Sequence, residues 1–167
     1  SLVNPETRIP FNIQRITGIT PAMVSKAPIF ADIAQQVNEI FNDATLCAHH
    51  ARFDYSFIQT ELARSNISFN QPRICTVQLS RKLYPEHRSH SLSSIIKRLN
   101  LTCNARHRAL GDTDVLVQFA KHIDYDFSNQ QIEAALKPVG RSTALPPNFT
   151  RRSLDFLPQQ PCLLYTS

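Results

Sequence analysis

Apolar side chains recur at three- and four-residue steps in several stretches of the chain, and two short apolar runs lie between them. The three- and four-residue steps predict amphipathic helices, and the short runs between polar ends predict buried strands. The predicted helices cover residues 27–43, 53–66, a short segment that stops before Pro85, 89–100, 112–123 and 128–137. The predicted strands cover residues 44–50 and 74–76. This alternation of strands and helices predicts an α/β layer fold.

The polar positions sharpen the ends and the faces of these helices. Ser91 precedes an apolar stripe and is expected to cap the 89–100 helix. In the 112–123 helix, Asp112 and Asp114 fall in the first turn, where a carboxylate suits the helix dipole. Before residue 22 the prolines exclude a long helix. The side chains expected to face inward are Phe53, Phe57, Ile58 and Leu62 in one helix, and Val115, Leu116, Phe119 and Ile123 in another.

The length and composition predict one ordinary domain with a basic net charge. Its 167 residues are 42% apolar, and the formal net charge of +5 permits a phosphate-bearing partner without requiring one. The four cysteines contain no Cys-x-x-Cys pair, so we expect reduced thiols and a cytoplasmic protein. No apolar run is long enough to span a bilayer. Residues 1–137 are expected to form the domain, and the proline-rich residues 138–161 a linker leaving it.

Two clusters of polar residues could carry chemistry. In the first, a strand ends in His49 and His50, and Asp54 follows at the start of a helix. In the second, His107 precedes Asp112 by five residues, a step of about 140° on a straight helix, so the two side chains would not share a face. They can converge only if His107 lies in a loop and Gly111 bends the chain into the helix. Taken alone, each of these residues is better explained by a structural role: a carboxylate in the first turn of a helix, a polar group at the end of a strand or a histidine in a loop.

Several motifs, taken together, resemble one family. The segments "ITGIT", "AHHARFDYSFI", "CTVQLSRKLYP", "SHSLSSIIKRL" and "RHRALGDTDV" follow the order and spacing of the DEDDh 3′–5′ exonucleases. This is the family of the proofreading epsilon subunit of bacterial DNA polymerase III. The resemblance covers roughly residues 2–123 and implies an RNase H-like fold, a mixed sheet flanked by helices.

The resemblance also implies a mechanism and assigns residues to it. Members of this family hydrolyse phosphodiesters with two divalent ions, Mg²⁺ or Mn²⁺, held by carboxylates. Carried onto this chain, the motifs make Asp54 and Asp112 metal ligands and His107 the general base. His49, His50 and Phe53 are expected beside the substrate. The expected partner is a 3′ end of DNA, single-stranded in form, and DNA polymerase III or repair proteins are further candidate partners.

The chain departs from the family pattern in two places within the motifs. The family has His-Asn where this chain has His49-His50. The family's first motif, Asp-x-Glu on the first strand, occurs nowhere in the 167 residues, so two of the four expected metal carboxylates are absent. We therefore expect a domain that lacks its first strands and a fragment that is nearly inactive by itself.

The C-terminal segment resembles the connector that joins such an exonuclease to a GIY-YIG endonuclease domain, with Cys162 in place of the expected glycine. Residues 162–167 resemble the translation of a sequencing adapter, which predicts a non-native tail; a native disordered tail is the alternative. Two other functions stay open. The domain could bind nucleic acid or a polymerase without cleaving, or it could be an RNA exonuclease of the same superfamily.

Overall fold

The computed structural model describes residues 2–103 and 109–137, which form eight helices and two strands. The predicted linker (138–161) and tail (162–167) lie outside these described residues. No helix among the described residues is long and apolar enough to cross a membrane. In chain order the elements are α1 (Phe11–Thr17), α2 (Pro21–Val24), α3 (Phe30–Ile40), β1 (Leu46–Ala48), α4 (Ala51–Arg64), β2 (Arg73–Cys75), α5 (Thr76–Leu83), α6 (Leu92–Leu99), α7 (Ala109–Asp126) and α8 (Asn129–Leu136).

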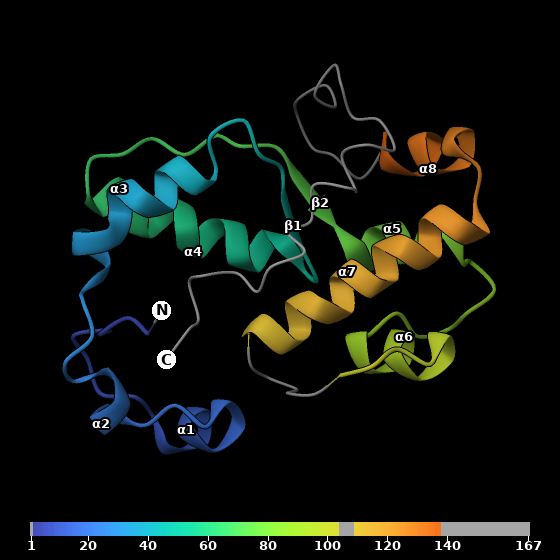
Figure 1. Cartoon of the computed structure of the whole chain (residues 1–167). Coiled ribbons are helices and arrows are strands. Elements are labelled where there is room, and N and C mark those ends of the chain that lie inside the picture. Colours follow the sequence, from blue (N-terminus) through green and yellow to red (C-terminus); the bar gives the residue numbers. More distant parts are fainter. Residues whose placement is uncertain (1, 104–108, 138–167) are drawn as a thin grey trace.

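The two strands form a small parallel sheet at the centre of the molecule. β1 pairs with β2 in the register Leu46 to Arg73, Cys47 to Ile74 and Ala48 to Cys75. Figure 1 shows α3 and α4 on one side of these strands and α5 to α8 on the other. A parallel pair needs a crossover connection, and α4 supplies it. The architecture is therefore the α/β layer fold predicted from the alternation of elements.

Two apolar clusters hold the layers, one on each side of the sheet. Both clusters reach the strands: Leu46 belongs to the smaller one, under α3 and α4, and Ile74 to the larger one. Alternate residues of a strand point to opposite faces, which explains how two short strands serve two cores. The smaller cluster comprises Ala34, Leu46, Ala51, Tyr55, Leu62 and Phe69. The larger comprises Ile74, Leu79, Leu83, Tyr84, Leu92, Ile95, Leu101, Val115, Phe119, Ile123, Ala135 and Leu136.

Several predicted boundaries are confirmed at the level of single residues. The Ser91 side chain accepts a hydrogen bond from the backbone N–H of Ser94, so it caps α6 as expected. The second predicted strand, residues 74–76, is observed one residue earlier, because Thr76 already begins α5. That helix ends at Leu83, two residues before Pro85, as the proline predicts.

The predicted inward face of α4 is wrong in part. Phe53 and Phe57 are 65% and 57% exposed, whereas Tyr55 on another side of the helix is buried. The Tyr55 hydroxyl donates a hydrogen bond to the backbone carbonyl of Phe69, and the Arg73 guanidinium lies over its ring. The apolar residues of this helix form more than one stripe, so the spacing alone could not select the buried one.

The predicted start of α7 is also wrong. The helix begins at Ala109, three residues before Asp112, because Ala109 and Leu110 are good helix formers that extend the helix upstream. Gly111 therefore lies inside the helix and is buried; it is not the bend between a loop and a helix. Asp112 stays in the first turn, whereas Asp114 lies beyond it and is exposed.

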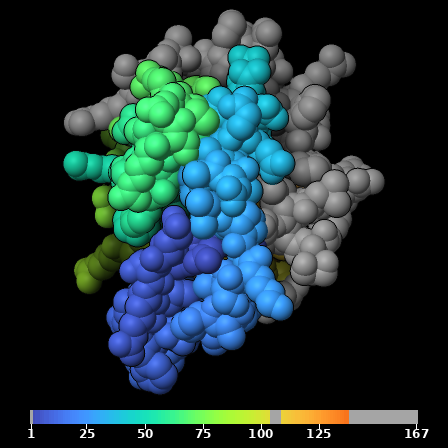
Figure 2. Space-filling view, turned by 90° about the vertical axis from the view of Figure 1, so that its left-hand side faces the viewer, coloured from blue at the N-terminus to red at the C-terminus, as the bar shows by residue number. Residues whose placement is uncertain are grey.

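The N-terminal segment contains no long helix, as its prolines require, but it does contain two short ones. α1 buries none of its residues, and its C-terminal end is closed by Gly18 in the left-handed conformation (φ 69°). α2 buries Val24. Figure 2 shows this segment, in dark blue, as a projection below α3 and the residues that follow it. A hydrogen bond from the Asn4 backbone N–H to the Pro28 carbonyl ties its start to the entry of α3.

Candidate active site

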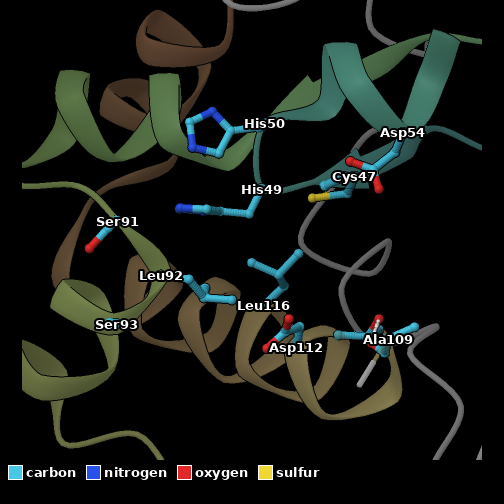
Figure 3. A pocket seen from close by; sticks show the side chains of 12 residues that line it. Cys47, His49, His50, Asp54, Ser91, Leu92, Ser93, Ala109, Asp112 and Leu116 are labelled. Atoms are coloured by element: carbon cyan, nitrogen blue, oxygen red, sulfur yellow. Dashed lines mark hydrogen bonds between the residues drawn. The ribbon is translucent and has the colours of Figure 1, made fainter. Parts of the chain in front are cut away.

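One pocket of about 390 Å³ lies where the two layers meet, at the end of β1. Side chains from four elements reach it, and Figure 3 shows Asp54 in its upper part and Asp112 in its lower part, with His49 at a level between them. Ligand sites of open α/β sheets lie at the carboxyl ends of parallel strands, which is the edge used here. The lining residues are Cys47, Ala48, His49, His50, Asp54, Ser91, Leu92, Ser93, Ala109, Asp112, Thr113 and Leu116.

The turn between β1 and α4 depends on His50. This residue precedes α4 with φ 70° and ψ 43°, in the left-handed region that most side chains avoid. Asparagine and histidine are both enriched in that region, so His50 is compatible with this conformation, as the asparagine expected from the resemblance would be. The turn also brings the two histidine rings together, with centroids 5.2 Å apart in an edge-to-face arrangement.

Asp54 projects into the pocket from the first turn of α4. Desolvation raises the pKa of its carboxyl above the ordinary value; a hydrogen bond from its own backbone N–H and the nearby His50 oppose this rise. Burial disfavours the carboxylate form, and a bound cation would favour it. The position therefore suits a residue whose charge is compensated by a ligand.

Asp112 reaches the same pocket from α7, on the other side of the sheet. Two carboxylates from separate layers thus line one cavity, and hard carboxylate oxygens are the ligands that Mg²⁺ prefers. Within residues 2–103 and 109–137 no group of three side chains is gathered that could hold a metal ion by itself. The donors fit a divalent ion in kind, and a complete two-metal site would need further ligands.

His49 is held by a residue that the sequence did not point to. Its Nδ1 lies 3.0 Å from Oγ1 of Thr76, the first residue of α5. The Thr76 hydroxyl also donates to the Ala48 carbonyl at 3.3 Å, and the residue is 3% exposed. Because β1 and β2 are parallel and in register, His49 and Thr76 follow paired residues at the same edge of the sheet. A single threonine after a strand forms no sequence pattern, so the sequence could not predict this contact.

The structure therefore brings together four of the predicted site residues: His49, His50, Asp54 and Asp112. Phe53 does not line the pocket; its ring packs against Phe57 on the exposed face of α4, with centroids 4.8 Å apart. His107 lies outside the described residues, two positions before α7 begins. Sequence reasoning missed the small polar residues Ser93 and Thr113 of the lining, because isolated residues of this type carry no pattern.

A protein-family model described as Exonuclease (RNase_T) matches residues 1–120. The chain belongs to this exonuclease family. The DNA polymerase III subunit epsilon-like protein of Rhodobacter capsulatus is 37% identical over 115 residues, 68% of this chain and 16% of that protein. A Mycobacterium tuberculosis protein, named as a bifunctional exonuclease/endonuclease, is 33% identical over 135 residues, 79% of this chain and 21% of that protein. The chain thus spans about a fifth or less of the length of these relatives.

A solved structure supports the same assignment in three dimensions. Exonuclease X in complex with 5′ overhanging duplex DNA superimposes with a TM-score of 0.57 at 25% sequence identity, covering 81% of this chain and 79% of that one. The resemblance to DEDDh exonucleases and the RNase H-like fold are thereby confirmed. The family generally uses divalent metal ions, which agrees with the two carboxylates that line the pocket.

Proposed function

We propose that this domain belongs to a 3′–5′ exonuclease that hydrolyses DNA from a 3′ end with the help of two divalent metal ions. One observation carries the proposal: Asp54 and Asp112, from opposite layers of an exonuclease-family fold, line the same pocket. Relatives with polymerase and exonuclease names, and a DNA-bound structural neighbour, support DNA as the substrate. The proposal places the protein in replication or repair, in the cytoplasm.

The residues divide into three roles under this proposal. Asp54 and Asp112 hold Mg²⁺ or Mn²⁺ through their carboxylates, and His107 takes the proton of the attacking water. His49 and His50 contact the terminal nucleotide from the end of β1, and Phe53 contacts it from outside the pocket. When bound, the two ions activate water and stabilise the charge that develops on the phosphate during in-line displacement.

The absence of Asp-x-Glu from the 167 residues leaves the proposed metal site with half of its carboxylates. We expect this chain by itself to be nearly inactive and a version extended upstream by an Asp-x-Glu strand to be active. The measurement is a nuclease assay with Mg²⁺ or Mn²⁺ on single-stranded DNA labelled at its 5′ end. Robust cleavage by the unextended chain would contradict the need for that motif.

In the extended, active protein, His107→Ala and Asp112→Ala should each lower kcat by orders of magnitude. Asp114→Ala is the matched control, because Asp114 is two residues from Asp112 and exposed on the same helix. We expect the control to keep near-normal activity. Unchanged rates in both site variants would remove the assignment of this pocket as the active site.

The same protein distinguishes the two alternatives. A binding module would bind single-stranded DNA, as measured by fluorescence anisotropy. Even the version extended by the Asp-x-Glu strand would then release no nucleotide with either metal. An RNA exonuclease would degrade an RNA oligonucleotide faster than a DNA oligonucleotide of matched sequence. Our proposal expects nucleotide release from the 3′ end and a faster rate on DNA.

A further inference from the structure

Thr76 is buried at the end of β2, next to a site residue of the adjacent strand. Its hydroxyl is within hydrogen-bonding distance of two groups at the end of β1: the Ala48 carbonyl at 3.3 Å and, in the next residue, the His49 Nδ1 at 3.0 Å. Thr76 lies outside the pocket lining, whereas Ala48 and His49 are part of it. Thr76 therefore contacts a residue that lines the pocket without lining the pocket itself.

The hydrogen-bond roles of these groups follow from the chemistry of the atoms. A carbonyl oxygen can only accept, so the single hydroxyl proton of Thr76 goes to Ala48. The Thr76 oxygen must then act as the acceptor toward His49, which requires a proton on Nδ1. In the other neutral tautomer Nδ1 carries a lone pair, and the hydroxyl would have to leave the Ala48 carbonyl to reach it. One tautomer keeps both hydrogen bonds and the other keeps one.

We propose that Thr76 is a positioning residue that locks His49 in the Nδ1–H tautomer and fixes the orientation of its ring. In this tautomer Nε2 carries no proton, so it can accept a hydrogen bond and cannot donate one to a phosphate oxygen. Under the proposed function, Nε2 of His49 would then accept a hydrogen bond from a hydroxyl or amino group of the nucleotide once the groups that bury this atom in the structure are displaced. This functional part rests on the proposed function, whereas the tautomer lock itself does not.

The tautomer can be measured directly, without any activity. Two-bond and three-bond ¹H–¹⁵N correlation spectra of the full 167-residue chain identify the protonated nitrogen of each neutral histidine, and His49→Gln assigns the His49 signals. We expect a single Nδ1–H pattern for His49 in the wild-type protein at pH 8. Thr76→Val, which replaces the hydroxyl by a methyl group of similar size, should give a mixture of tautomers. Thr76→Ser should restore the single pattern.

An Nε2–H pattern for His49 in the wild-type protein would overturn the lock, and this result does not depend on the folding of either Thr76 variant. An unchanged Nδ1–H pattern in folded Thr76→Val would overturn it as well. The second readout is the binding of a deoxynucleoside monophosphate in the presence of Mg²⁺. It is measured from the shifts of the histidine ring signals during a titration. We expect several-fold weaker binding by Thr76→Val than by Thr76→Ser. If the tautomer changes and the affinity does not, the lock stands and the nucleotide-contact role of His49 is wrong.

Discussion

The two layers that flank the sheet differ in how many of their residues are buried. α5 buries five of its eight residues, and Phe119 of α7 is fully enclosed. On the other side, α4 buries three of its fourteen residues and leaves Phe53 and Phe57 exposed. The candidate site takes Asp112 from the well-packed layer and Asp54 from the sparsely packed one. The position of Asp54 therefore depends on a smaller core than that of Asp112.

The largest expected effect tests this difference in packing. Phe119→Ala opens a cavity in the larger cluster and should lower the free energy of unfolding by about 3–5 kcal/mol. Phe57→Ala is the matched control, since it removes the same ring from an exposed position of α4 and should change stability by less than about 0.5 kcal/mol. Urea denaturation followed by circular dichroism measures both. Equal losses would mean that the exposed face of α4 is packed in solution.

A second test concerns the helix that brings Ser91 and Ser93 to the pocket. Ser91→Ala removes the acceptor for the Ser94 backbone N–H at the start of α6 and should cost about 1 kcal/mol. Ser56→Ala is the control: Ser56 lies inside α4, where alanine is a better helix former than serine. The control should be neutral or slightly stabilising in the same urea titration. A loss from the control as large as that from the cap variant would contradict the capping role.

The third test uses the raised pKa of Asp54. Burial favours the protonated form, so the contribution of this carboxyl to stability is greatest at acid pH and is lost as the pH rises through the folded-state pKa. Without metal, Asp54→Asn should therefore melt a few degrees above the wild type at pH 7, and the gap should narrow toward pH 4. Added Mg²⁺ should raise the melting temperature of the wild type more than that of the variant.

Thermal melts in EDTA and in excess Mg²⁺, from pH 4 to pH 7, check both parts of this prediction. Glu61→Gln serves as the control, because Glu61 lies on the same helix outside the pocket lining. The difference between its melting temperature and that of the wild type should be the same with and without metal. Asp54→Asn melting below the wild type at neutral pH without metal would show that the carboxylate is already compensated within the protein.

The smallest effect is expected from His50→Asn, at the turn from β1 into α4. Asparagine accepts the left-handed conformation at least as well as histidine, so His50→Asn should raise the free energy of unfolding by a few tenths of a kcal/mol. Alanine does not accept it well, and His50→Ala should lower the same quantity by about 1 kcal/mol. Urea titrations of the two variants give the comparison. Equal stability of both would mean that this turn relaxes out of the left-handed region.

The sequence by itself determined the order of strands and helices from residue 27 onward, the cap at Ser91 and the family, because these depend on local spacing, local hydrogen bonds and contiguous motifs. It also selected His49, His50, Asp54 and Asp112, which the fold gathers in one pocket. The roles of these residues remain a prediction, as do the linker and the tail.

Only the tertiary structure decided which side of α4 is buried, where α7 begins and what holds His49. Tyr55 is buried in preference to Phe57 because two residues distant in the sequence contact it. The Phe69 carbonyl accepts a hydrogen bond from its hydroxyl, and the Arg73 guanidinium lies over its ring. Thr76 meets His49 because two parallel strands end at the same level. Contacts of this kind depend on how separate elements pack, so they cannot be predicted from the spacing of residues along the sequence.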